Sequence, residues 1–156
     1  MRLFLSAALF GLVGCGGADD GPVVPQRVSG KVYYDGKPAV GVKVYFIPTD
    51  APMLPRIPHN PLGVTGPDGA FTLTTFKDGD GAAEGGYQVV FTWPPDETKK
   101  SESDEATEAD RLLGWYDGTH STIYVRIKAG SNEIPTFNLP KRTQPPQASQ
   151  GVPGRN

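Results

Sequence analysis

Acidic residues gather in one glycine-rich stretch of the chain, where they could act as ligands for a cation. Asp78 and Asp80 alternate with glycines, and Glu84 follows shortly after them. Calcium binds several carboxylate and carbonyl oxygens on a tight bend, so this spacing is compatible with a calcium or small-ligand site. It falls short of an EF-hand, because the later ligand positions and the flanking helices are missing. A loop between strands needs the same residue types for its geometry alone, and both interpretations stay open.

The two histidines, His59 and His120, give little support for an enzyme. They belong to different expected loops and lack a third ligand at the short spacing that zinc sites use. Ser121 follows His120, but adjacent residues of a strand point to opposite faces, and no Gly-x-Ser-x-Gly turn is present. We therefore predict no catalytic residues, no resident metal and no cofactor. Trp115 and Tyr116 are expected to pack at the start of a strand, because aromatic side chains supply large buried areas.

The single cysteine, Cys15, carries the strongest chemical signal. Arg2 precedes an apolar run from Leu3 to Val13, and Leu12-Val13-Gly14 leads directly into the cysteine. A secretory signal has an apolar region of about 7 to 15 residues. This run is too short to span a membrane, which takes roughly 20 apolar residues. The alternative is an ordinary cysteine within a plain cleaved signal peptide.

The Leu-Val-Gly-Cys sequence resembles the lipobox of bacterial lipoproteins. The resemblance implies that residues 1–14 form a removed signal peptide and that Cys15 becomes a lipidated N-terminus. Dual or triple acylation would hold the protein firmly, because a single acyl chain gives only marginal membrane binding. The bilayer would then be one partner, and the domain would face the periplasm or the cell exterior. Gly16 rather than an aspartate follows the cysteine, which favours the outer membrane.

The composition sets further limits on function. The formal net charge is -2, and no stripe of clustered lysine and arginine is present, so we exclude nucleic acid as a partner. No second cysteine is available for a disulfide, so the domain must rely on its apolar core. An envelope protein or a glycan remains as a possible partner.

Apolar residues alternate with polar ones in several short segments, which predicts strands. We expect these strands at residues 28–34, 42–47, 63–65, 70–75, 87–93, 122–128 and 133–139. Turn signals separate them, among them Asp35-Gly36-Lys37-Pro38 and Gly66-Pro67-Asp68-Gly69. The pattern favours an all-β fold: a single antiparallel β-sandwich of about seven strands.

Two loops interrupt this pattern. The first is proline-rich and carries Met53, Leu54 and Ile57, which either dock a partner or close one end of the sandwich. The second, residues 94–111, is polar and acidic and is typical of a solvated insertion. A short helix from Ser103 to Leu113 is possible there.

The turns and strands at Gly30–Pro38, Val42–Phe46, Thr65–Phe71 and Gly85–Val89 together resemble the carboxypeptidase regulatory-like, or transthyretin-like, β-sandwich. The late strand pair with Tyr116 is similar to small lipoproteins of planctomycete-type bacteria. This resemblance implies a fold and carries no catalytic residue to the chain. We therefore expect a signal peptide (1–14), a flexible spacer (15–27), one β-sandwich domain (28–140) and a tail without structure (141–156).

Overall fold

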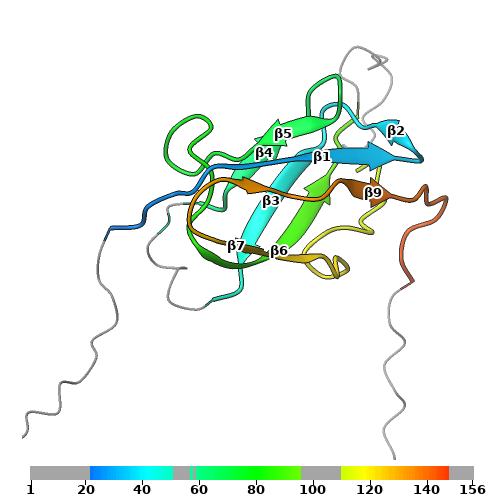
Figure 1. Cartoon of the computed structure of the whole chain (residues 1–156). Coiled ribbons are helices and arrows are strands. Elements are labelled where there is room, and N and C mark those ends of the chain that lie inside the picture. The colour runs from blue at the N-terminus through cyan, green and yellow to red at the C-terminus, as the bar shows by residue number, and fades with distance from the viewer. Residues whose placement is uncertain (1–21, 51–56, 58, 96–109, 148–156) are drawn as a thin grey trace, which may run out of the picture.

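The computed structural model describes residues 22–50, 57, 59–95 and 110–147. These residues form two β-sheets that pack against each other, as Figure 1 shows. The elements described are all strands and connecting loops, which agrees with the predicted all-β sandwich. No helix in the described part of the chain is long and apolar enough to cross a membrane.

The first sheet is built around one long strand, β1 (Val28–Tyr34). It pairs antiparallel with β2 (Lys37–Pro38) and β5 (Ala70–Thr72), and parallel with β8 (Asn132–Glu133) and β9 (Phe137–Leu139). The expected continuous strand at 133–139 is thus two short strands, and both run parallel to β1. The two parallel pairs make this sheet mixed.

The second sheet is antiparallel throughout and has the order β4, β3, β6, β7. Its bounds are β3 (Lys43–Pro48), β4 (Leu62–Val64), β6 (Gly85–Thr92) and β7 (Tyr124–Ile127). The longest pairing joins β3 to β6, from Lys43 opposite Thr92 to Pro48 opposite Tyr87. All the strand positions predicted from alternation are occupied, with ends that differ by a few residues.

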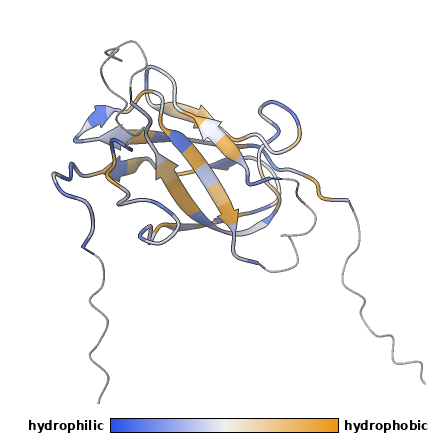
Figure 2. Ribbon diagram, turned by 180° about the vertical axis from the view of Figure 1, so that it is seen from behind, coloured by the Kyte–Doolittle hydropathy of each residue, from blue (hydrophilic) through white to orange (hydrophobic). Residues whose placement is uncertain are grey.

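The core lies between the sheets and follows the predicted alternation. Val44 and Phe46 of β3 are fully buried, as are Val89 and Phe91 of β6. Burying one such side chain stabilises the fold by about 1.5 to 3 kcal/mol. Figure 2 shows the hydrophobic residues concentrated in the strands and the hydrophilic ones in the connecting turns.

Two loops set the ends of β1. At its far end, Asp35 and Gly36 form a two-residue hairpin turn with φ values of 50° and 74°, which is the conformation that Asp-Gly favours. Lys37 and Pro38, predicted as part of the turn, form β2 instead. At its near end, Gln26 pairs with Ala82 of the glycine-rich loop. These two loops lie at opposite ends of the sandwich (Figure 1).

Of the helix expected at 103–113, only residues 110–113 lie in the described part, and Arg111, Leu112 and Leu113 form turns instead. Leu113 and Gly114 have positive φ values of 57° and 75°, which a right-handed helix does not accommodate. The rest of that range lies outside the described residues.

Candidate functional site

The glycine-rich loop at residues 77–84, here called the aspartate loop, is organised by the side chain of Asp80. Its two carboxylate oxygens accept hydrogen bonds from the backbone N–H groups of Thr75, Phe76 and Lys77, at 2.7, 3.0 and 2.9 Å. Partial burial alone would raise the pKa of Asp80, but these hydrogen bonds outweigh it and hold the pKa below its ordinary value. The carboxylate therefore serves the loop itself.

The other two carboxylates predicted for a cation site, Asp78 and Glu84, are exposed. Within the described residues, which include all three, no group of three or more histidine, cysteine or acidic side chains could hold a metal ion. The aspartate loop thus uses its acidic and glycine residues for backbone geometry. Gly81 illustrates this, because a Cβ atom there would lie 1.7 Å from the carbonyl oxygen of Gln26.

The histidine and serine considered for catalysis are not aimed at each other. His120 places Nδ1 2.9 Å from Asp117 Oδ1, and this carboxylate also accepts the backbone N–H groups of Thr119 and His120. Ser121 is buried, and its hydroxyl donates to the carbonyl of Val89. His59 is exposed in another loop.

The aromatic pair Trp115 and Tyr116 packs as expected. Tyr116 meets Phe91 edge to face, with ring centroids 6.1 Å apart, and burial raises its pKa while nearby Arg142 acts in the opposite direction. The Trp115 indole N–H donates to the Gln144 carbonyl, and the Arg142 guanidinium lies 4.5 Å from the Trp115 ring centroid. Residues 141–144, expected within an unstructured tail, therefore contact the domain.

Some predicted residues fall outside the described part. Cys15 lies there, as do Met53 and Leu54 of the proline-rich loop. Ile57 is described and is partly buried.

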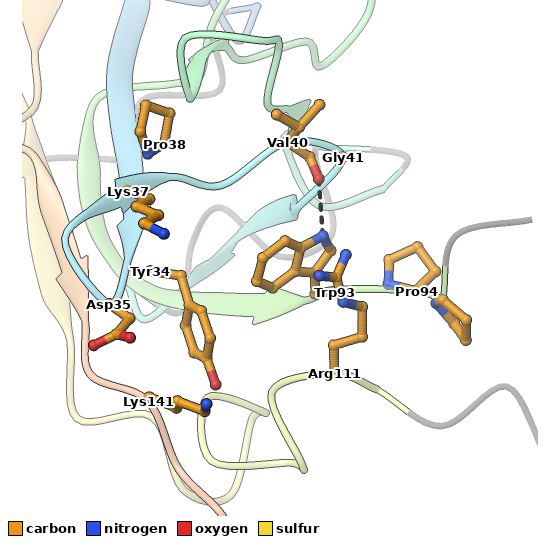
Figure 3. A pocket seen from close by; sticks show the side chains of 11 residues that line it. Tyr34, Asp35, Lys37, Pro38, Val40, Gly41, Trp93, Pro94, Arg111 and Lys141 are labelled. Carbon is orange, nitrogen blue, oxygen red and sulfur yellow. Dashed lines mark hydrogen bonds between the residues drawn. The ribbon is translucent and has the colours of Figure 1, made fainter. Parts of the chain in front are cut away.

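A separate site emerges at the opposite end of β1, and we call it the cationic groove. It is an open cavity of about 670 Å³. Its charged and aromatic lining consists of Tyr34, Asp35, Lys37, Trp93, Arg111 and Lys141. Figure 3 shows these side chains around one opening, together with Pro38, Val40, Gly41 and Pro94. Pro95 also lines the groove. The volume falls within the usual range of about 300 to 1,000 Å³ for ligand sites.

Trp93 forms the floor of the groove. Its indole N–H donates to the carbonyl of Val40 at 2.8 Å, and Tyr34 meets it edge to face at 5.2 Å between ring centroids. The Arg111 guanidinium carbon lies 3.6 Å from the Trp93 ring centroid (Figure 3). Packing on the indole restricts the arginine side chain, which nevertheless stays exposed to solvent.

The side chain of Asp110 holds in place the turn that contains Arg111. Asp110 Oδ1 accepts the backbone N–H groups of Trp93 and Leu112 at 2.7 and 3.1 Å, and Oδ2 accepts that of Gly114 at 3.1 Å. The backbone N–H of Arg111 in turn donates to the Trp93 carbonyl. The nearest carboxylate in sequence is therefore bound to backbone rather than to the arginine.

The groove carries more positive than negative charge. The lining includes three cationic side chains, those of Lys37, Arg111 and Lys141, and one carboxylate, that of Asp35. All four residues are exposed. Among the described residues, none of these three cations takes part in an ion pair. Their donors are thus available for a ligand.

Sequence reasoning missed this groove. Trp93 falls within the strand expected at 87–93, but Lys37, Arg111 and Lys141 come from three separate segments with no local motif. The one signal was a lone arginine directly after an acidic stretch, which by itself reads as ordinary surface.

Two solved structures resemble this chain, and both are DUF3823 family proteins. The protein from Bacteroides ovatus ATCC 8483 is 17% identical with a TM-score of 0.38, and the match covers 74% of this chain and 44% of that one. The protein from Parabacteroides merdae ATCC 43184 is 18% identical with a TM-score of 0.34, and the match covers 78% and 46%. This chain thus spans less than half the length of either structure. No family model matches the chain. No curated protein matches it either.

Proposed function

We propose that this chain is a lipid-anchored, non-catalytic β-sandwich protein of the bacterial cell envelope, whose domain binds a partner beyond the membrane. The observation that carries the proposal is the sequence Leu12-Val13-Gly14-Cys15 behind a short apolar run. The outer membrane is the favoured location, with the domain facing the periplasm or the cell exterior.

The arrangement of the domain supports a binding role. A tethered Cys15 would connect through residues 16–27 to the near end of β1. The cationic groove lies at the far end of β1, because Tyr34, the last residue of that strand, and Asp35 line it. The seven residues of β1 separate the two ends by about 20 Å at roughly 3.3 Å per residue. A partner could therefore reach the groove while the opposite end is tethered.

For its family, we propose the carboxypeptidase regulatory-like, or transthyretin-like, group of sandwiches in a planctomycete-type lipoprotein. The Asp35-Gly36 hairpin turn and the Gly66–Gly69 turn support this proposal, because both fall between strands as in the resemblance described above. An experimental structure that superposes on such domains strand for strand would test it.

The anchor is tested by the intact mass of the membrane-extracted protein, with fractionation of the cells. We expect a diacylglyceryl-sized mass increment on the wild type and loss of membrane association in Cys15→Ala. The variant Ser6→Ala, changed within the same apolar run, serves as the matched control and should keep both properties. An unmodified mass with a soluble wild-type protein would refute the anchor.

A further inference from the structure

We propose that the cationic groove binds an acidic glycan, a saccharide chain whose sugars carry carboxylate or phosphate groups. This inference deepens the binding role proposed above and rests on it. It starts from the three uncommitted cations, Lys37, Arg111 and Lys141, around one open cavity of about 670 Å³. Hydrogen bonds between charged partners are about twice as strong as neutral ones, so these residues favour an anionic ligand.

Arg111 is the fixed element of the site. Its guanidinium is stacked on Trp93, and Trp93 is itself held by its hydrogen bond to Val40. A planar guanidinium presents paired donors that match the two oxygens of a carboxylate or phosphate. Because the side chain is already restricted in the free protein, binding costs less conformational entropy than it would for a free arginine.

Lys141 belongs to a segment, residues 141–144, that is held in place by contacts with Trp115. The next residue, Arg142, stacks on Trp115, and the Trp115 indole binds the Gln144 carbonyl at 2.6 Å. These contacts hold the backbone of Lys141 beside the groove while its ammonium stays exposed. Lys37 enters the groove from β2.

The backbone around the groove disfavours a peptide as the ligand. One common way for an extended peptide to bind is to add a strand to a sheet edge through main-chain hydrogen bonds. Here the edge strand β2 has two residues, and Pro38 offers no N–H. Pro94 and Pro95 also lack this donor. Strand addition is therefore disfavoured at this edge, and the side chains of the groove are the main candidates for contact with a ligand.

The apolar part of the lining suits a saccharide. The half-buried Tyr34 ring, the exposed Val40 and the proline rings of the rim provide apolar surface between the cations. Sugar rings present C–H groups that can pack there while their acidic groups meet Arg111 and the lysines. The cavity of about 670 Å³ is large enough for more than one sugar ring.

Calorimetric titration of the purified full-length protein in detergent tests this inference. The probes are an oligogalacturonate, a phosphorylated oligosaccharide of the same length, a neutral oligosaccharide and oligoglutamate. We expect saturable binding of at least one acidic saccharide that weakens with added salt, and the stronger of the two identifies the preferred acidic group. Equal binding of the neutral sugar, tighter binding of oligoglutamate, or no binding of either acidic saccharide would overturn the proposal.

Variants locate the binding in the groove. Arg111→Gln and Lys141→Gln should each weaken the affinity about tenfold, whereas Arg111→Lys should retain part of it. Lys128→Gln removes an exposed lysine outside the groove and should leave the affinity unchanged. Equal weakening in Lys128→Gln would show non-specific charge attraction and overturn the site. Binding is measured in solution, so the result does not depend on whether Cys15 is lipidated.

Discussion

The charged residues at the two ends of the sandwich differ in whether they have partners within the protein. In the aspartate loop, both carboxylate oxygens of Asp80 accept backbone N–H groups, and the loop folds around them. In the cationic groove, Arg111 and Lys141 are positioned by their neighbours and have no ion pair among the described residues. A charged residue that forms its hydrogen bonds with backbone groups stabilises the fold. A charged residue that is held in position but has no such partner is available to bind a ligand.

The comparison also shows that the types of residue in a segment do not by themselves reveal what the segment does. The aspartate loop has the composition of a cation site, yet its glycines and Asp80 serve chain geometry. The groove has no motif in sequence, yet it brings together cations, aromatic rings and a cavity. We expect substitutions at the first end to affect stability and those at the second to affect binding.

The largest effect is expected for Gly81→Ala in the aspartate loop. The new Cβ would lie 1.7 Å from the Gln26 carbonyl oxygen, at a φ of 98° that side chains rarely adopt. We expect a loss of about 3 kcal/mol in the free energy of unfolding, measured by urea denaturation.

Gly36→Ala at the groove end is the matched control. Gly36 also has a positive φ, 74°, but its Cβ would meet nothing within 4 Å. The loss should be only about 1 kcal/mol, from backbone strain alone. Equal losses in the two variants would show that the close contact at Gly81 is relieved by movement of the chain.

A somewhat smaller effect is expected for Asp80→Ala. Three backbone N–H groups lose their acceptor, and we expect about 2 kcal/mol of destabilisation in the same measurement. Asp78→Ala, in the same loop but exposed, should change stability by less than about 0.5 kcal/mol. If Asp78→Ala lost as much stability as Asp80→Ala, the role of the Asp80 carboxylate as acceptor for these N–H groups would be contradicted.

The strands could be predicted from the sequence because period-two alternation is a local signal. Val44 and Phe46, in the strand expected at 42–47, face the core, and so do Val89 and Phe91 in the strand expected at 87–93. The parallel pairing of β8 and β9 with β1 was missed, because no local pattern records which distant strand lies alongside. Turn chemistry placed Asp35-Gly36 but not the strand β2 that follows it.

The groove could not be predicted for the same reason. Tyr34, Trp93, Arg111 and Lys141 come together only through the strand order and the anchored turn at Asp110. The aspartate loop has a composition that suggests a cation site because its acidic residues and glycines are contiguous in the sequence. The residues of the cationic groove are brought together only by the tertiary fold.

A moderate effect on the pH dependence of stability is expected from Asp80 in the aspartate loop. The folded-state pKa of Asp80 is below its ordinary value, so this group's contribution is complete above the unfolded pKa of 3.8. It is lost as the pH falls through the lower folded pKa. Urea midpoints should therefore fall below about pH 4, and less steeply in Asp80→Asn than in the wild type.

Asp68 and Asp117 also have lowered pKa values, Asp68 chiefly through its hydrogen bond with the backbone N–H of Ala70. The Asp80→Asn profile should therefore keep part of its slope. An unchanged slope would remove Asp80 from the acid response.

The smallest effect on stability is expected at the groove. Lys141→Gln removes an exposed charge without an ion pair in the described structure, so the free energy of unfolding should change by less than about 0.5 kcal/mol. Arg111→Gln gives up the stack on Trp93 and should cost about 0.5 to 1 kcal/mol. Urea denaturation of both variants beside Asp80→Ala makes the comparison direct. A loss of about 2 kcal/mol in Lys141→Gln would show that this lysine is committed to the fold, and the distinction between the two ends would fail there.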